Sequence, residues 1–190
     1  MDRQTVLSIL DRAEARMEGH FRLSSGRHGA VYIQCGRVFQ YPEMAGALCK
    51  ELASRFSEID AVAGPALGAV IMSYEVSRHL NCRNLFAERE NGVMTLRRGF
   101  FIKPGERVLV VEDAVTTGGS AKETVGLCRE HGADVVGVGA LVDRTGGTNP
   151  FDVPFEALAR LDIPSWTEEE CPLCREGVPC VKPGSRPGAR

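Results

Sequence analysis

The stretch VLVVEDAVTTGGS, residues 108–120, places residue types that bind charged ligands directly after a hydrophobic run. Glycine, threonine and serine at the start of a helix supply free backbone N–H groups and hydroxyl donors, and the helix dipole adds partial positive charge. Gly118 and Gly119 let the backbone approach a ligand closely and adopt positive φ. The turn is therefore suited to bind a phosphate monoester.

Two acids, Glu112 and Asp113, precede this turn, and carboxylates at the phosphate itself would repel it. They are expected to accept hydrogen bonds from hydroxyl groups or to bind Mg²⁺. A phosphate with a vicinal diol nearby describes a ribose 5-phosphate. The chain has neither GxxxxGK[ST] nor GxGxxG after a strand, which disfavours nucleotide triphosphate hydrolysis and dinucleotide binding. The alternative is a plain helix cap, with the acids balancing the dipole.

From residue 60 onward, short hydrophobic runs alternate with helical patterns. Strands are expected over 60–64, 84–88, 107–113 and 134–143, and helices over 67–80 and 118–132. Strands buried on both faces and separated by helices indicate an α/β fold with a parallel sheet. Ligand sites of such sheets form at the carboxyl ends of strands, where Glu112 and Asp113 lie.

The N-terminal part is expected to begin with a helix, because hydrophobic residues recur at helical spacing from Val6 to Met17. Gly19 is expected to end this helix. The SSG turn and a strand over 31–35 follow, and the next helix begins near Pro42. We expect one domain over 1–164.

Two segments depart from regular alternation. Residues 86–106 mix charged residues with glycines and predict a long hairpin or a mobile flap. Residues 165–190 are rich in proline, glycine and cysteine and predict an irregular C-terminal appendage.

Composition sets limits on partners and location. The net charge of -2 gives no general attraction to nucleic acid or to an anionic membrane, so neither is an expected partner. No run of 18 apolar residues occurs, and the N-terminus lacks the order of a signal peptide, so a cytoplasmic protein is expected. Four of the seven cysteines lie singly in hydrophobic segments and are expected to be reduced core residues.

The other three cysteines form CPLCREGVPC, with Cys171, Cys174 and Cys180. This spacing could bind Zn²⁺ with a fourth ligand from histidine or another region of the chain. The alternatives are a reactive dithiol and a reduced structural hook.

VLVVEDAVTTGGS closely resembles the phosphoribosyl-pyrophosphate (PRPP) binding motif of type I phosphoribosyltransferases. The resemblance implies their open, mainly parallel sheet flanked by helices, with Glu112 and Asp113 on the ribose hydroxyls. It implies a 5'-phosphate loop made of Ala114, Val115, Thr116, Thr117, Gly118, Gly119 and Ser120. AGPALGAV, residues 63–70, resembles the family's pyrophosphate loop, which uses backbone groups of residues such as Ala66 and Leu67; a plain Gly-Pro turn is the alternative.

Two further segments resemble orotate phosphoribosyltransferases: HFRLSSGRHGAVYIQCGRV, residues 20–38, and LVDRTGG, residues 141–147. In that family the first segment closes over the pyrimidine, which makes residues 1–40 an N-terminal helix and lid, and an arginine at the second meets orotate. An arginine fork suits a carboxylate. The implied orotate-binding residues are Arg144, Thr116 and Ser25, and weaker lid candidates are Phe21, Arg22, Arg27 and Tyr32. Arg144 could instead be a solvated charge, and the lid a hydrophobic cluster or surface turn.

The resemblance implies transfer of ribose 5-phosphate from PRPP to N1 of orotate, with Mg²⁺ as cofactor, Asp113 in a catalytic role and a homodimer as the assembly. Known members carry a lysine-rich mobile loop, yet no lysine occurs here between Lys50 and Lys103. We expect Arg89 to replace it at the pyrophosphate. The alternative is a charged hairpin in which Glu88 and Glu90 pair with the arginines.

Two other functions remain open from the sequence. A purine phosphoribosyltransferase would keep the PRPP loop but should lack SSGRHG. A regulator that senses PRPP without catalysis would need a nucleic-acid-binding part, and no basic domain or appended helix-turn-helix is evident.

Overall fold

A computed structural model describes residues 1–23 and 25–183 of the chain. Along the chain the helices and strands are α1 (Arg3–Arg12), β1 (Arg16–Arg22), β2 (His28–Ile33), the 3₁₀ helix η1 (Cys35–Gln40), α2 (Pro42–Ala53), β3 (Ala61–Pro65), α3 (Val70–Leu80), β4 (Arg83–Glu90), β5 (Val93–Leu96), β6 (Arg107–Val115), α4 (Gly119–Glu130), β7 (Asp134–Asp143), β8 (Phe155–Arg160), β9 (Ser165–Trp166) and α5 (Pro172–Arg175).

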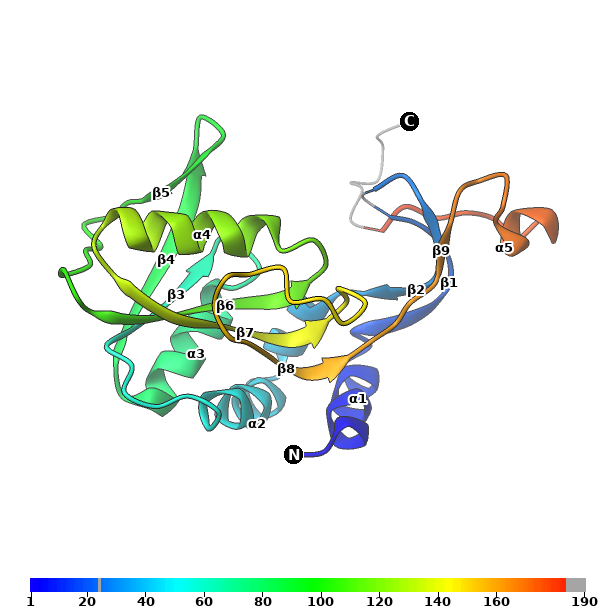
Figure 1. Cartoon of the computed structure of the whole chain (residues 1–190). Helices are drawn as coiled ribbons and strands as arrows, with labels where there is room; N and C mark the ends of the chain where they lie inside the picture. The colour runs from blue at the N-terminus through cyan, green and yellow to red at the C-terminus, as the bar shows by residue number, and fades with distance from the viewer. Residues whose placement is uncertain (24, 184–190) are drawn as a thin grey trace.

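The central sheet has the strand order β5-β4-β3-β6-β7-β8. All neighbours pair in parallel except β4 and β5, which are antiparallel. Helix α4 covers one face, and α1, α2 and α3 lie on the other (Figure 1). The predicted open, mainly parallel α/β sheet is therefore confirmed, and β8 is a strand that the sequence patterns did not reveal.

Strand β6 shows why the sheet needs both layers of helices. Its side chains alternate between faces, so Leu109 and Val111 join the core beneath α1, α2 and α3. Val108 and Val110 join the core beneath α4. All four are fully buried, and burying each such side chain contributes about 1.5–3 kcal/mol.

The N-terminal helix is shorter than its hydrophobic spacing predicts. It ends at Arg12, because Glu14 takes a left-handed φ of 51° and the Ala15 N–H donates to the carbonyl of Leu10 at 2.8 Å. This is a left-handed helix cap formed without glycine. Met17 and Gly19 therefore lie in β1, and the prediction of helix up to Gly19 was wrong.

Strands β1, β2 and β9 form a second, antiparallel sheet beside the central one (Figure 1). Strand β2 begins at His28, earlier than the strand predicted over 31–35, and η1 follows it. The C-terminal segment is more regular than its composition predicts, since it supplies β9 and α5. The Val181 N–H donates to the His20 carbonyl at 2.8 Å, and the Arg22 N–H donates to the Val181 carbonyl at 2.9 Å.

The predicted hairpin within 86–106 is present. Strands β4 and β5 pair across a two-residue turn, in which Asn91 and Gly92 have φ of 53° and 86°. Positive φ at both positions matches the twist of a tight hairpin. Residues 97–106 then lead back to the amino end of β6.

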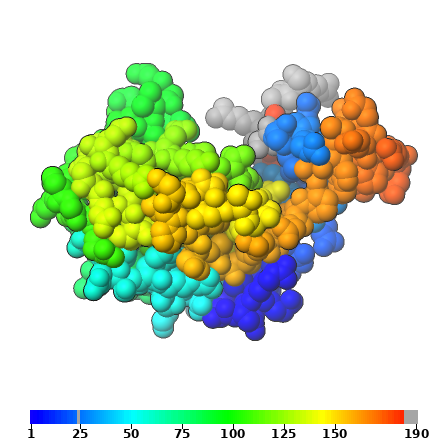
Figure 2. All heavy atoms as spheres, viewed as in Figure 1, coloured from blue at the N-terminus to red at the C-terminus, as the bar shows by residue number. Residues whose placement is uncertain are grey.

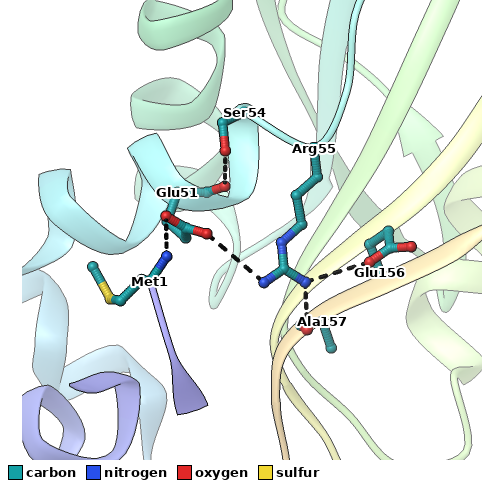
Figure 3. A network of polar contacts seen from close by, with 6 residues as sticks. All are labelled: Met1, Glu51, Ser54, Arg55, Glu156 and Ala157. Atoms are coloured by element: carbon teal, nitrogen blue, oxygen red, sulfur yellow. Dashed lines mark hydrogen bonds and ion pairs between the residues drawn. The ribbon is translucent and has the colours of Figure 1, made fainter. Parts of the chain in front are cut away.

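A polar network ties α2 to both ends of the domain (Figure 3). Glu51 forms an ion pair with the N-terminal ammonium of Met1, at 2.7 Å. Arg55 pairs with Glu156 at 3.3 Å and donates to the carbonyl of Ala157 at 2.9 Å. These contacts fasten β8 at the edge of the sheet. Within 1–23 and 25–183, no helix is long and apolar enough to cross a membrane.

Candidate active site

The carboxyl ends of β3 and β6 form the point where the sheet reverses its direction of winding. Strand β3 continues through α3 to β4 on one side, and β6 continues through α4 to β7 on the other. Ligands of open α/β sheets bind in the crevice at such a point. The two loops are close, because a Cβ on Gly68, after β3, would lie 3.4 Å from an Oδ of Asp113.

The loop after β6 presents unused hydrogen-bond donors. The backbone N–H groups of residues 116–120 donate to no atom of the described chain. Gly118 precedes α4 with a left-handed φ of 75°, and its carbonyl accepts from the Lys122 N–H at 2.8 Å. The loop borders a hollow of about 240 Å³, lined by Arg89, Glu112, Ala114, Val115, Thr116, Thr117, Gly118, Gly119, Ser120 and Glu123. This geometry can bind a phosphate dianion.

The two acids point to different sides of β6. Glu112 lines the hollow beside the loop, whereas Asp113 faces Gly68. Asp113 accepts from the Ala114 N–H at 2.7 Å, and Glu112 accepts from the Asp113 N–H at 3.3 Å. Neither forms an ion pair within the described residues, so their other oxygens are available to hydroxyl donors or a cation.

Burial makes ionisation of this acid pair costly. Desolvation, followed by the charge of Asp113, raises the pKa of Glu112 to about 8. Desolvation likewise raises the pKa of Asp113, although the Ala114 N–H partly offsets it. A ligand that brings hydroxyl donors or a hard cation would favour the charged forms. Oxygen donors of this kind fit Mg²⁺.

The loop after β3 offers donors from a different set of residues than the sequence suggested. The Ala66 N–H is occupied, since it donates to the Ala87 carbonyl at 2.7 Å. The N–H groups of Leu67 and Gly68 have no acceptor within 1–23 and 25–183. The Leu67 side chain is 88% exposed. Leu67 therefore keeps a free N–H group, as the sequence suggested, and Gly68 rather than Ala66 offers the second one.

Arg89 reaches the phosphate hollow from the end of β4. Its guanidinium pairs with Glu123 of α4 at 2.6 Å and donates to the Gly92 carbonyl at 2.9 Å. The other two arginines of this region follow the charged-hairpin alternative: Arg97 pairs with Glu90 at 3.2 Å and Arg98 with Glu88 at 3.0 Å. Arg89 alone of these three lines the hollow beside the 116–120 loop, and its role at the pyrophosphate stays a prediction.

Arg144 follows β7, and its N–H donates to the Val115 carbonyl at 2.8 Å, which places it beside the phosphate loop. Its Nε is buried and has no partner in the described chain. Burial lowers the pKa of this guanidinium. A second hollow of about 280 Å³ is lined by Arg144, Gly146, Leu161, Asp162, Ile163 and Pro164. A half-buried arginine whose Nε lacks a partner is suited to bind an anion, which favours this role over that of a solvated strand-end charge.

Ser25 lines neither of these two hollows. It is exposed in the turn between β1 and β2, where its hydroxyl accepts from the Arg27 N–H at 3.4 Å. Arg27 donates to the Ser165 carbonyl of β9 at 2.6 Å, and Phe21 packs on Tyr32 with ring centroids 5.8 Å apart. These predicted lid residues therefore hold the second sheet together. Figure 2 shows the surface hollowed between this sheet and the part that carries α4 and β5.

Cys35 is a site neighbour that sequence reasoning treated only as core. It is buried as predicted, but burial and then the charge of Asp113 raise the pKa of its thiol, while Arg144 opposes this rise. Cys35 therefore lies near both Asp113 and Arg144. No local pattern in the sequence signals this position.

Comparison with known proteins identifies the family. A model of the phosphoribosyl transferase domain matches residues 41–157. Orotate phosphoribosyltransferase of Thermotoga maritima is 56% identical over 183 residues, which are 95% of this chain and 98% of that protein. The chain belongs to the orotate phosphoribosyltransferase family. The orotate phosphoribosyltransferase of Caldanaerobacter subterraneus is 54% identical, over 98% of this chain and 99% of that protein.

Solved structures agree on the scaffold of this orotate phosphoribosyltransferase family member. The orotate phosphoribosyltransferase of Aeropyrum pernix superposes with a TM-score of 0.71 at 26% identity, over 82% of this chain and 93% of that one. An adenine phosphoribosyltransferase of Trypanosoma brucei superposes with a TM-score of 0.62 at 17% identity, over 80% and 79%. The second match shows the type I fold alone, so the fold does not select the base.

Proposed function

We propose that this chain transfers ribose 5-phosphate from PRPP to N1 of orotate, giving orotidine 5'-monophosphate and pyrophosphate for pyrimidine biosynthesis. The observation that carries this proposal is the crevice between β3 and β6, where free N–H groups of two loops and two carboxylates meet. The names of relatives more than 50% identical over nearly their full length favour orotate as the base.

The PRPP molecule is expected to lie across this crevice. Its 5'-phosphate accepts from the N–H groups of 116–120 at the start of α4, whose dipole favours the negative charge. Glu112 and Asp113 accept from the ribose hydroxyls, which lowers the cost of keeping both acids ionised. The Leu67 and Gly68 N–H groups, which have no acceptor in the described part of the chain, are expected to donate to the pyrophosphate.

Cleavage of the bond between C1 and pyrophosphate places positive charge on the ribose ring and negative charge on the leaving group. Residues that bind the leaving group therefore act in the transition state. Bound Mg²⁺ would neutralise charge on the pyrophosphate. The carboxylates of Glu112 and Asp113, which are expected to face the ribose, are the residues suited to hold this ion. N1 of orotate forms its bond to C1 as the C1–O bond to pyrophosphate breaks, and the N1 proton is released to solvent or to the leaving pyrophosphate. No covalent nucleophile is needed from the chain.

Arg144 is expected to bind the orotate carboxylate, with Thr116 nearby. Arg144→Ala should raise KM for orotate about 10–100-fold, since a charge-assisted hydrogen bond contributes about 1.5–3 kcal/mol. Arg144→Lys should raise KM for orotate by less, because lysine keeps the positive charge but cannot bind the carboxylate in a bidentate manner. Steady-state kinetics with varied orotate measure this.

The control is Arg129→Ala. Arg129 lies in the last turn of α4 and forms an ion pair with Asp152, which lies outside that helix. This variant should behave like the unsubstituted chain. An Arg144→Ala variant that loses affinity for PRPP as much as for orotate would contradict the assignment.

Arg89 is expected to bind the leaving pyrophosphate after exchanging its partner Glu123 for phosphate oxygens. Arg89→Ala should lower kcat about 10–100-fold, because the lost contact is strongest when charge develops on the leaving group. Arg89→Lys should recover part of kcat. Rates at saturating substrates give the comparison.

Arg97→Ala is the matched control, because Arg97 lies in the same region and pairs only with hairpin carboxylates. Unchanged kcat in Arg89→Ala, with thermal stability lowered as in Glu123→Gln, would assign the ion pair a structural role alone.

The reaction itself is tested by product identification. The chain, PRPP and Mg²⁺ are incubated with orotate, uracil, adenine or hypoxanthine, and nucleotides and pyrophosphate are separated and identified by mass. Of the four bases, only orotate should give a nucleotide, and that nucleotide should be orotidine 5'-monophosphate. A purine nucleotide would indicate the purine enzyme, and PRPP binding without pyrophosphate release would indicate a sensor.

The assembly and location are further parts of the proposal. Ile71 and Tyr74 of α3, and Leu67 in the loop before this helix, expose large hydrophobic side chains, which suits burial in a homodimer. Light scattering measures the mass. The seven unpaired cysteines, most of them buried, suit a reducing compartment such as the cytoplasm.

A further inference from the structure

Two histidines and two cysteines converge where the N-terminal hairpin meets the C-terminal segment. His20 on β1 is 3% exposed, His28 on β2 is 5% exposed, and Cys171 at the start of α5 is fully buried. Cys174 of α5 is half-buried. One ligand atom from each residue lies within 4.8 Å of all the others.

The distances come close to those of a tetrahedral metal shell. Zn–N bonds of about 2.0–2.1 Å and Zn–S bonds of about 2.3 Å place ligand atoms roughly 3.3–3.8 Å apart. His20 Nε2 lies 3.5 Å from the Cys171 sulfur and 3.7 Å from the Cys174 sulfur. His28 Nδ1 lies 3.2 Å from the Cys174 sulfur and 2.9 Å from His20 Nε2. Only small shifts separate these atoms from one common centre.

His20 is already oriented as a metal ligand. Its Nδ1 lies 2.7 Å from the Val178 carbonyl, which can only accept, so Nδ1 carries the proton. The lone pair of Nε2 then points at the cluster. Metal-binding histidines characteristically donate their second N–H to a carbonyl or carboxylate in this way.

We propose that His20, His28, Cys171 and Cys174 bind one Zn²⁺ ion in a closed structural site. Two thiolates and two imidazoles are the donors that zinc prefers, whereas Mg²⁺ takes oxygen ligands. The ion is therefore separate from the metal expected at the PRPP crevice. Cys180, whose sulfur lies 3.9 Å from His28 Nδ1, stands beside the shell without belonging to it.

The ion would crosslink parts of the chain that are distant in sequence. Its ligands come from β1, β2 and the segment around α5. Other contacts there include short backbone pairings at Val181 and β9 and the bond from His20 to the Val178 carbonyl. Because binding occurs only in the folded state, zinc should raise the melting temperature. It should also protect the α5 segment from proteases.

The test is metal analysis of the full chain, purified under reducing conditions after growth with added zinc. We expect one tightly bound zinc per chain. Removal of zinc and titration with Co²⁺ should give a thiolate-to-cobalt charge-transfer band and the visible bands of tetrahedral cobalt. These spectra need no substitution, so they remain informative if a variant folds poorly.

Variants identify the ligands. Cys174→Ser and His28→Asn should lose the metal, while Cys180→Ser should retain it. Cys82→Ser is the matched control, because Cys82 is a half-buried thiol outside the cluster. No stoichiometric metal and no cobalt charge-transfer band would overturn the site. Loss of metal in Cys180→Ser with retention in His28→Asn would overturn the ligand set in favour of three cysteines and His20.

Discussion

Glu112→Gln and Asp113→Asn are each expected to lower kcat/KM for PRPP about 10–100-fold while making the fold more stable. The loss of activity follows because each carboxylate accepts a charged hydrogen bond from ribose, at about 1.5–3 kcal/mol. The gain in stability follows because both acids are held in a desolvated crevice that raises their pKa values.

For Glu112 the pH dependence can be stated. Its folded pKa of about 8 exceeds the ordinary value of 4.5, so this group lowers the free energy of unfolding as pH rises from about 4.5 to 8. Glu112→Gln removes this decrease in the free energy of unfolding. The variant should gain roughly 1–4 kcal/mol near pH 8 and nothing near pH 4.5. Thermal unfolding at several pH values measures this.

Asp134→Asn serves as the control, since Asp134 is exposed at the amino end of β7, away from the crevice. It should leave both activity and the pH dependence of stability unchanged. An acid-pair variant with normal kcat/KM would contradict the ribose assignment, and one destabilised at pH 8 would contradict the desolvation argument.

Gly118→Ala is expected to produce the largest increase in KM for PRPP, of about 100-fold or more. The position has a φ of 75°, and an added Cβ would lie 3.0 Å from the Phe151 ring and 3.1 Å from Pro150. The strain and the contact must shift the loop whose N–H groups are expected to bind the 5'-phosphate. Binding of PRPP, measured by calorimetry, should weaken in parallel.

Gly105→Ala separates backbone strain from loop displacement. Gly105 has a similar φ of 81°, has open space around it, and lies before the amino end of β6. It should lower stability by about 1–2 kcal/mol and leave KM for PRPP unchanged. Equal effects of the two substitutions on KM would mean that the 116–120 loop does not bind the phosphate.

The sequence predicted the part of the site that is local in the chain. The run from Val108 to Ser120 carries its own periodicity, acids and glycines, so the strand, the turn and the start of α4 were all recognisable. Contacts made by folding could not be predicted. Arg89 meets Glu123 on another element, and Gly68 meets Asp113 only because β3 and β6 are neighbours.

The N-terminal region shows how tertiary pairing overrides a local pattern. Residues up to Met17 have helical spacing, yet pairing with β2 extends β1 from Arg16 to Arg22. The same pairing places His20 and His28 opposite the C-terminal cysteines. A fourth zinc ligand from histidine was considered from the sequence, but its identity depends on contacts across most of the chain.

The most direct test of the proposed function follows the absorbance of orotate when the chain is mixed with orotate, PRPP and Mg²⁺, with uracil and hypoxanthine as parallel bases. The absorbance should fall with orotate, the other bases should remain unchanged, and Asp113→Asn should slow the fall at low PRPP. Measurable PRPP binding with constant orotate absorbance would contradict the assignment and indicate a PRPP-binding protein without catalysis.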